Sequence, residues 1–464
     1  EEVIMADKTK KEELKKHYLS GKEAREIAKK NKEFVKQLEK RKKRKNADAS
    51  EYTTEMKDPR NIVEFDNLHT YFFTDAGVSK AVNGVSFSIP ENSVVGIVGE
   101  SGCGKSVTSL SLMQLIQGPT GQIVKGEIRF KASEFKKDEN GKPIPVYKKK
   151  LDENGNVVKD ENGNDVIETA PVLDKHGKPV VDKDGNVKYA PVQARDEAGV
   201  LKYETEEKVY DIARMPLKDM SKIRGRQIAM IFQEPMTSLN PVFTIGNQLD
   251  EVTLLHIRDA DKAEAKRRSL EMLELVGIAM PERVYKSYPH EISGGMRQRV
   301  MIAMALACNP RLVIADEPTT ALDVTIQAQI LDLLRDVRKK MNGSIMLITH
   351  DLGVIAEMAD YVYVMYAGKV VEQGTAQEIF KNPLHPYTIG LQKSKPVVGK
   401  EVDELYSIPG NVPNPVNMPD YCYFRERCNA CTEKCAGKYP AFVKVSPTHG
   451  VACYKYTDKA ETDE

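Results

Sequence analysis

The sequence lacks three features that would each indicate a particular class of protein. It contains no run of about 18 apolar residues, so we do not expect the chain to cross a bilayer by itself. Its N-terminus has no apolar stretch of the secretory type. It also lacks an excess of either charge: 69 Lys and Arg stand against 68 Asp and Glu, which gives no electrostatic sign of a nucleic-acid-binding protein. With 464 residues, 41% of them hydrophobic, the chain is long enough for two or three globular units.

The balanced total hides a basic segment at the start of the chain. Residues 1–50 hold 17 Lys and Arg against 10 Asp and Glu. From Lys8 to Lys45 the composition favours a helix with a thin apolar stripe, and we assign residues 1–57 to a basic helical extension. A solvated extension without a ligand of its own is the first interpretation. Attraction to an anionic membrane surface is the alternative, and nuclear targeting is a third.

A second unusual segment, residues 131–208, repeats one kind of turn. The sequence Asp-x-x-Gly occurs there at residues 138–141, 152–155, 160–163, 174–177 and 182–185. Such a turn suits a β-hairpin, because Gly adopts a positive φ and Asp caps the turn through its side chain. We therefore predict a hairpin-rich insertion. Calcium loops are the rival interpretation, although the closing bidentate Glu of that pattern is missing.

Strand-like and helix-like patterns alternate through most of the remaining sequence. Strands are expected at residues 62–65, 85–89, 94–98, 227–232, 312–316, 344–349 and 361–365, and helices at residues such as 262–276 and 326–340. Strands alternating with helices of this length predict a mainly parallel α/β core. After residue 394 the sequence turns to Pro-rich loops and a cysteine cluster, which places a domain boundary there.

One glycine-rich stretch has the pattern of a phosphate-binding loop. Residues 99–106, Gly-Glu-Ser-Gly-Cys-Gly-Lys-Ser, fit G-x-x-x-x-G-K-[ST] directly after a strand and open a helix expected over residues 107–116. Glycines let the backbone fold around an anion, Lys105 neutralises the β and γ charges, and Ser106 is placed to bind Mg²⁺. The residues assigned to ATP here are Gly99, Ser101, Gly102, Cys103, Gly104, Lys105, Ser106 and Val107.

The strand at residues 312–316 supplies the acidic counterpart of this loop. Four apolar residues lead to Asp316, which is expected to lie beside the phosphates and to hold Mg²⁺ through water. Glu317 follows it directly. The strand is therefore interpreted as a Walker B strand, in which Glu317 acts as a general base or orients the attacking water.

Four further elements follow in a characteristic order. They are Gln233 after the strand at 227–232, Ser293-Gly294-Gly295-Met296-Arg297-Gln298 before the next helix, Ala321-Leu322-Asp323 after Glu317, and Thr349-His350-Asp351 at a strand end. With the phosphate loop and the Walker B strand, they resemble the nucleotide-binding subunit of an ABC transporter. The resemblance covers about residues 58–393 apart from the insertion.

The resemblance implies a P-loop NTPase core with an antiparallel β subdomain and a helical signature subdomain. It implies Gln233 as the Q-loop residue, Asp323 as the D-loop residue and His350 as the switch histidine. The implied catalytic residues are Glu317, His350 and Gln233, and the implied Mg²⁺ ligands are Ser106, Gln233 and Asp316. The implied signature, Ser293, Gly294, Gly295 and Met296, begins a helix and acts on ATP bound by a partner subunit. Adenine is expected to stack on Phe72, with the adjacent Tyr71 as the alternative.

A narrower resemblance comes from residues 289–299, 316–324 and 382–388. These look like the D-type ATPase subunit of bacterial oligopeptide and dipeptide permeases. The resemblance implies an ATP-hydrolysing subunit that energises oligopeptide uptake from the cytoplasmic face of the membrane. It also implies a second ATPase subunit as heterodimer partner, two membrane permease subunits and an extracellular peptide-binding protein, with no nucleic acid.

Other functions remain open on the sequence alone. The main alternative is a regulatory or weakly hydrolysing ATPase subunit of a transporter for another substrate, such as nickel or dipeptides. A chromosome-maintenance ATPase would separate the loop from the signature by coiled coils, whereas residues 131–208 are hairpin-like. A translation-type ABC protein would carry two nucleotide domains, and only one is present.

Five of the seven cysteines fall within residues 422–453, which favours a metal or cluster site over a disulfide framework. Four thiolates suit either Zn²⁺ or a four-iron cluster, and spacing alone favours zinc. The resembled permease subunit carries a [4Fe-4S] site in this region. The resemblance implies Cys422, Cys428, Cys435 and Cys453 as the ligands of this site, within a small Cys-rich domain over residues 394–464. Cys431 is then not a ligand.

Overall fold

The computed structural model describes residues 21–75, 77–174, 177–195, 199, 201–234, 238–320, 323–341, 343–394 and 406–460. It divides the chain into two compact units. The larger comprises Glu1–Lys131, Val209–His256 and Asp261–Glu464, and the smaller comprises Ala132–Lys208 with Ile257–Ala260. The first half of the predicted basic helix, residues 1–20, lies outside the described residues.

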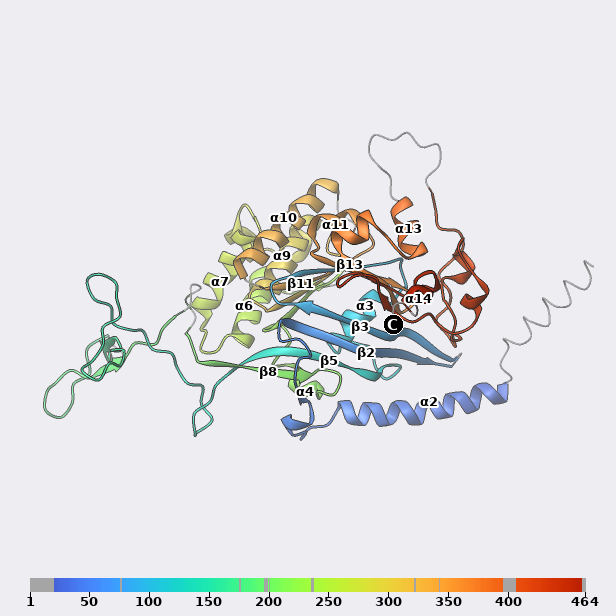
Figure 1. Ribbon diagram of the computed structural model, residues 1–464. Helices are drawn as coiled ribbons and strands as arrows, with labels where there is room; N and C mark the ends of the chain where they lie inside the picture. Colours follow the sequence, from blue (N-terminus) through green and yellow to red (C-terminus); the bar gives the residue numbers. More distant parts are fainter. Residues whose placement is uncertain are drawn as a thin grey trace, which may run out of the picture. The chain divides into compact units, whose positions relative to one another are not determined.

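An eight-stranded sheet forms the centre of the larger unit (Figure 1). Its order is β14 (Val443–Lys444), β15 (Gly450–Val451), β13 (Lys369–Thr375), β12 (Tyr361–Tyr366), β4 (Val94–Val98), β11 (Ser344–Thr349), β10 (Leu312–Asp316), β9 (Ile228–Ile231). The strands from β12 to β9 run parallel. Every residue of β4, β9, β10 and β11 is buried, as expected for apolar strands covered on both faces. The predicted parallel core is confirmed.

A five-stranded sheet, mostly antiparallel, carries the β subdomain. Its order is β1 (Thr53–Thr54), β8 (Thr205–Asp211), β5 (Gly121–Phe135), β2 (Asn61–Thr74), β3 (Gly77–Pro90). Strands β2 and β3 extend well beyond the short apolar runs predicted from the sequence. The polar residues between those runs are paired across the two strands, although several bulges shift the register.

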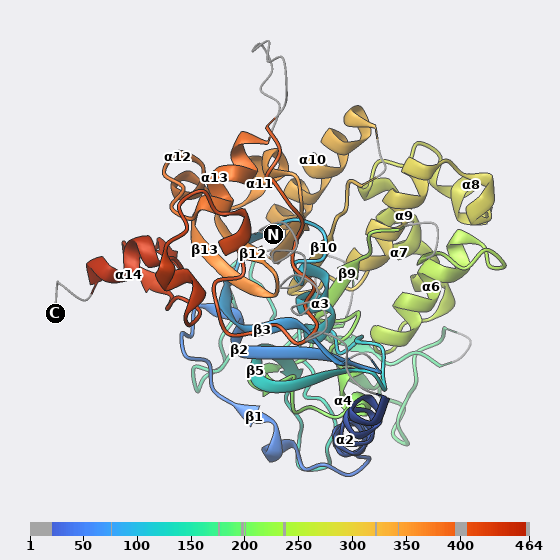
Figure 2. The same ribbon diagram turned by 90° about the vertical axis from the view of Figure 1, so that its right-hand side faces the viewer.

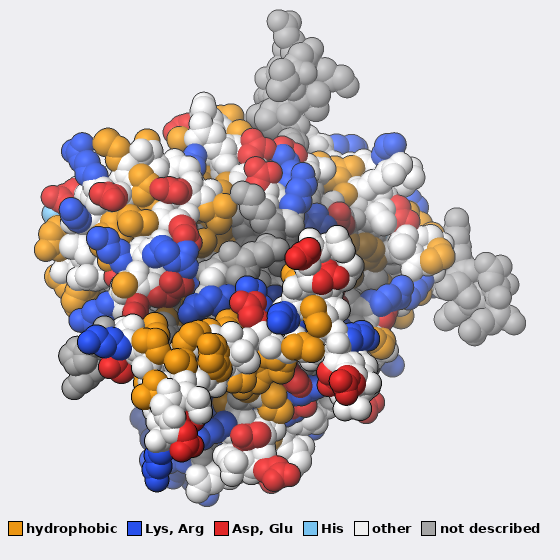
Figure 3. All heavy atoms as spheres, turned by 90° about the vertical axis from the view of Figure 1, so that its left-hand side faces the viewer, with side chains coloured by type: hydrophobic (Ala, Val, Ile, Leu, Met, Phe, Trp, Pro, Cys, Tyr) orange, Lys and Arg blue, Asp and Glu red, His pale blue; other side chains and the backbone are white. Residues whose placement is uncertain are grey.

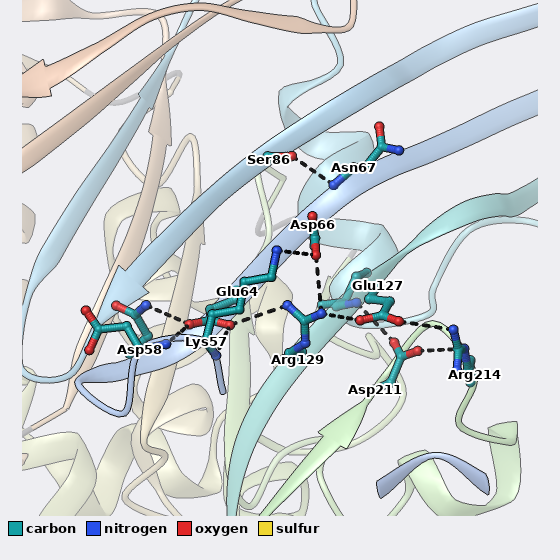
Figure 4. A network of polar contacts seen from close by, with 12 residues as sticks. Lys57, Asp58, Glu64, Asp66, Asn67, Ser86, Glu127, Arg129, Asp211 and Arg214 are labelled. Carbon is teal, nitrogen blue, oxygen red and sulfur yellow. Dashed lines mark hydrogen bonds and ion pairs between the residues drawn. The ribbon is translucent and has the colours of Figure 1, made fainter. Parts of the chain in front are cut away.

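Buried charges on this sheet neutralise one another (Figure 4). Arg129 lies 3.5 Å from Glu64 and 3.2 Å from Asp66, and also pairs with Glu127. Glu64 in turn accepts hydrogen bonds from the backbone N–H groups of Lys57 and Asp58. Such a network ties the loop before β2 to β5, because an unpaired charge at this depth would be costly.

The helices of the larger unit lie mainly beside the central sheet. They are α2 (Gly21–Lys42), α3 (Lys105–Leu112), α4 (Leu217–Met220), α6 (Ile245–His256), α7 (Lys262–Leu275), α8 (Pro281–Lys286), α9 (Gly294–Leu306), α10 (Val324–Met341), α11 (Leu352–Met358), α12 (Ala376–Lys381), α13 (Pro386–Lys393) and α14 (Tyr454–Ala460). Figure 2 shows α6 to α9 on the side of β9 and α12 to α14 on the side of β13. None of the helices in the described part of the chain is long and apolar enough to span a membrane.

Helix α2 packs on the antiparallel sheet (Figure 1). The ring centroid of Phe34 lies 5.7 Å from that of Phe73 in β2, and Val35 is buried. Glu39 accepts a hydrogen bond of 2.6 Å from Gln122 of β5. The described part of the basic segment is therefore a docked helix rather than a fully solvated one.

The smaller unit consists of hairpin turns. A two-stranded sheet pairs β6 (Thr169–Pro171) with β7 (Tyr189–Pro191), and isolated antiparallel bridges join further segments of the hairpins. At each fully described Asp-x-x-Gly turn the Asp carboxylate accepts backbone N–H groups, and the Gly has φ between +76° and +85°. The turn at 174–177 includes Lys175 and His176, which lie outside the described residues. The turn oxygens are therefore engaged within the hairpins, as the hairpin interpretation requires.

Candidate functional site

Four predicted motifs follow four neighbouring parallel strands. Strands β4, β11, β10 and β9 lie side by side, and they are followed by the phosphate loop, His350, Glu317 and Gln233, respectively. The carboxyl ends of parallel strands meet at one edge of a sheet, where α/β proteins bind their ligands. The topology thus brings together motifs that are up to 251 positions apart in the sequence.

The phosphate loop needs its glycines for conformation and for space. Gly102 and Gly104 have φ values of +79° and +92°, which disfavour any residue with a Cβ. A Cβ on Gly104 would lie 2.3 Å from the carbonyl oxygen of Ala81 in β3. Helix α3 begins at Lys105, directly after this glycine. The close approach of β3 therefore fixes the loop at the N-terminus of α3.

The ionisable groups of the loop are buried and mutually engaged. The Nζ atom of Lys105 donates to the carbonyl oxygens of Gly99 at 2.8 Å and Glu100 at 3.0 Å, and burial lowers its pKa. Ser106 Oγ donates to Asp316 at 3.0 Å. Burial raises the pKa of Asp316 to about 6, and the neighbouring Glu317 contributes in the same direction. A cation beside Ser106 and Asp316 would relieve this cost, so the pair fits Mg²⁺.

Glu317 is held by side chains from the neighbouring motifs. Its Oε2 atom accepts from Gln233 Nε2 at 2.9 Å and from Thr320 Oγ1 at 3.0 Å. Its Oε1 atom lies 3.3 Å from His350 Nδ1, and the His350 side chain is 61% exposed. The backbone of Glu317 has φ +47°, and its N–H donates to Ile348. Such strain at a non-glycine residue is typical of functional sites.

The predicted signature begins a separate helix. Ser293 caps α9, and its hydroxyl accepts from the Met296 N–H at 3.3 Å. From the same helix, buried Gln298 donates to the carbonyl oxygen of Pro318 at 2.7 Å, directly after Glu317. Asp323 caps the start of α10 through the Ile326 N–H, whereas Ala321 and Leu322 lie outside the described residues. One hydrogen bond therefore joins the signature helix to the Walker B turn.

Comparison with known proteins decides the family. The model of the ABC transporter family matches residues 82–184 and 192–320, and that of the oligopeptide/dipeptide transporter C-terminal region matches residues 371–435. The chain belongs to the ATP-binding proteins of ABC transporters. It is 42% identical to the oligopeptide transport ATP-binding protein AppD of Bacillus subtilis, over 86% of this chain and 98% of AppD. The B. subtilis proteins OppD (oligopeptide transport) and DppD (dipeptide transport) are 41% and 40% identical, over 84% and 86% of this chain and 87% and 96% of their own lengths.

As a member of this family the chain is an ATPase that uses ATP and Mg²⁺. Its aromatic residues ahead of the phosphate loop have distinct surroundings. The Tyr71 hydroxyl donates to Asn83 at 2.9 Å. Phe72 is paired with Gly121 of β5, and a Cβ on that glycine would lie 2.9 Å from the Phe72 ring. Phe73 contacts helix α2. The hydroxyl of Tyr71 is thus engaged elsewhere, and the stacking of adenine on Phe72 stays a prediction.

The four predicted cluster ligands of this ATPase surround a single cavity. Cys422, Cys428, Cys435 and Cys453 line a space of about 500 Å³, and Cys431 is exposed. Burial raises the pKa of Cys422 to about 12, and the nearby thiols add to this shift. However, among the described residues no group of three or more His, Cys, Asp or Glu side chains is placed to hold a metal ion. The predicted metal centre is therefore not supported as it stands.

Two residues from distant segments contact the phosphate loop, and the sequence analysis did not identify them. The Glu100 N–H donates to the Tyr387 hydroxyl at 2.7 Å, and the Glu100 carboxylate pairs with Arg427. Tyr387 belongs to α13 and Arg427 to the 3₁₀ turn η3 (Arg425–Arg427). No sequence signal connects positions separated by 287 and 327 residues.

Proposed function

We propose that the chain is the ATP-hydrolysing subunit of an importer that takes up oligopeptides at the cytoplasmic membrane. The ATPase function rests above all on Glu317, because the Q-loop and switch residues both contact its carboxylate beside the phosphate loop. The peptide substrate rests on relatives that are named as oligopeptide and dipeptide transport proteins. In this proposal residues 58–393 are the nucleotide-binding domain, residues 1–57 an extension, and residues 394–464 the C-terminal domain.

Each residue of the site has a proposed task in hydrolysis. Lys105, now bonded to loop carbonyls, turns to the β and γ phosphates when ATP enters. Ser106, Asp316 and Gln233 would hold Mg²⁺, which would supply positive charge beside the transferred phosphoryl group. Glu317 orients the attacking water, and the exposed His350 donates to the γ-phosphate. The signature from Ser293 to Met296 serves ATP bound by the second subunit.

The proposed partners are a second ATPase subunit, two membrane permease subunits and an external peptide-binding protein. Between Gln233 and α6, Val242 is 70% exposed and Phe243 is 50% exposed. Such exposed apolar side chains suit contact with a membrane subunit. On the face drawn in Figure 3, acidic and basic side chains are interspersed. A face of mixed charge differs from the basic patch that is typical of nucleic-acid-binding proteins.

Uptake by the reconstituted transporter tests this function. Proteoliposomes that hold ATP on the side of this subunit are expected to accumulate labelled oligopeptide, and a Lys105→Ala variant is expected to lose both uptake and ATP turnover. Uptake of dipeptides or nickel alone would favour the alternative substrates. If uptake persists in the Lys105→Ala variant, the partner ATPase drives transport, and this chain is a regulatory subunit.

We further propose that Cys422, Cys428, Cys435 and Cys453 hold a [4Fe-4S] cluster, with Zn²⁺ as the alternative. Four thiols that line one cavity suit either group in kind. The cluster would supply a rigid link between chain segments. Anaerobic purification with iron and sulfide assays decides: stoichiometric zinc without visible absorbance would refute the cluster.

A further inference from the structure

The phosphate loop is held from outside by one buried arginine. Arg427 Nη1 and Nη2 donate to the two carboxylate oxygens of Glu100 at 2.7 Å and 2.9 Å. This is a two-pronged ion pair, and the Arg427 side chain is 5% exposed. The guanidinium also donates to the carbonyl oxygens of Pro409 and Ile408 and to the Tyr366 hydroxyl. Arg427 is therefore fixed by its own segment and in turn fixes Glu100.

Glu100 connects Arg427 to Lys105, the lysine expected to bind the phosphates. It is the second residue of the loop, its N–H donates to Tyr387, and its carbonyl oxygen accepts from Lys105 Nζ at 3.0 Å. The side chain, the N–H and the carbonyl group of Glu100 thus each have a separate partner. A shift of Glu100 would move the start of the loop and one of the two carbonyls that hold the Lys105 ammonium.

The same arginine is anchored between two cysteines of the cavity. Turn η3 follows Cys422, whose carbonyl oxygen accepts from the Arg425 N–H, and it precedes Cys428, whose N–H donates to Arg425. The Arg427 N–H donates to Phe424, and the ring of Phe424 packs on Tyr387 at 5.5 Å between centroids. Displacement of Cys422 or Cys428 therefore displaces the backbone that carries the guanidinium.

We propose that Arg427 is a positioning residue for the phosphate loop, through which the cysteine-lined segment sets the affinity of the loop for ATP. The proposal rests on ATP binding at Lys105, as given under the proposed function, and does not depend on which group fills the cavity. Arg427 also neutralises a carboxylate next to an anion site. Without the guanidinium, the Glu100 charge is free to repel the phosphates.

Because the unpaired Glu100 carboxylate repels the phosphates, removing its charge should reverse the effect of losing Arg427. In the reconstituted transporter, Arg427→Gln is expected to raise the KM for MgATP by roughly tenfold or more, with a smaller change in kcat. Adding Glu100→Gln to this variant is expected to recover much of the affinity, because the unpaired carboxylate is gone. Arg425→Lys is the matched control: Arg425 lies in the same turn and stacks on Tyr421, and its variant is expected to keep the wild-type KM.

The second test asks whether the cavity acts through Arg427. Cys428→Ser is expected to raise the KM in the wild-type background and to have little further effect in Arg427→Gln, since the link is already broken. Thermal unfolding of each full-length variant separates a loss of folding from a loss of positioning.

The proposal is overturned if Arg427→Gln keeps the wild-type KM, or if Glu100→Gln gives no recovery. Fully additive effects of Cys428→Ser and Arg427→Gln would also overturn it. A wild-type transporter that neither binds nor hydrolyses ATP would instead refute the proposed function, so the two failures are distinguishable.

Discussion

A pair of glycine substitutions tests whether β3 holds the phosphate loop in shape. Gly102 and Gly104 both have positive φ, so alanine at either position carries a backbone cost of about 1–2 kcal/mol. The smaller entropy of the unfolded alanine chain offsets about 0.4–1 kcal/mol of this cost. The two glycines differ in the room available for a side chain. A Cβ on Gly102 would have no atom within 4 Å, whereas a Cβ on Gly104 would lie 2.3 Å from the Ala81 carbonyl oxygen.

The structure therefore predicts unequal effects. Gly102→Ala is expected to destabilise the nucleotide-free loop by about 0–1.6 kcal/mol. Gly104→Ala is expected to cost about 1–4.6 kcal/mol, because the overlap with backbone adds about 1–3 kcal/mol of overpacking to the same backbone cost. A chain of several units does not unfold in two states, so the assay is hydrogen exchange of the amides in β4 and α3, which reports local opening. Equal protection in the two variants would refute the role given to β3.

Two further predictions concern buried side chains beside the site. Replacing Gln298 by Leu leaves the Pro318 carbonyl without its partner, so we expect a local loss of about 1–3 kcal/mol in stability and slower ATP turnover. Hydrogen exchange of the α9 amides and a phosphate-release assay check these effects. Unchanged turnover would contradict the link between the signature helix and the Walker B turn. Burial lowers the pKa of His385 from 6.5 to about 4 in the folded protein. As the pH falls, the unfolded chain therefore binds a proton before the folded protein does. The folded protein thus loses stability between pH 6.5 and pH 4 that it has above pH 6.5. His385→Asn, which keeps an acceptor for the Tyr387 N–H, is expected to remove about 2 kcal/mol of the wild-type loss between pH 7.5 and pH 5, measured by hydrogen exchange of the α13 amides at the two pH values. The same pH dependence in both proteins would show that His385 is not the titrating group.

The sequence was sufficient for the parts of the site that local patterns encode. The phosphate loop, the Walker B strand and the switch histidine each follow an apolar strand, and the parallel order of those strands brings them to one edge. The short strands β4, β10 and β11 were predicted to the residue, because continuous apolar runs ended by turns define their limits. The long strands β2 and β3 were underestimated, since their polar residues pair in a sheet that periodicity alone does not reveal.

Contacts between distant segments could not be predicted. The pair Arg427–Glu100 joins a 3₁₀ turn to the phosphate loop across 327 positions, and neither residue alone signals the other. The docking of α2 on β2 depends on the contact between Phe34 and Phe73. The sequence placed Phe34 on the thin apolar stripe of the basic helix but did not indicate its partner. The cysteines are an intermediate case. Their clustering in the sequence indicated a shared site, and in the structure four of them line one cavity, although the described residues form no metal-binding group.

The most direct test of the central claim is the ATP turnover of the reconstituted transporter with Glu317→Gln. Glutamine keeps the size of the side chain near Gln233, Thr320 and His350 but removes the charge that orients water. The account predicts that ATP still binds, while turnover and peptide uptake fall together by about 100-fold or more. Unchanged turnover would contradict the assignment of hydrolysis to this site.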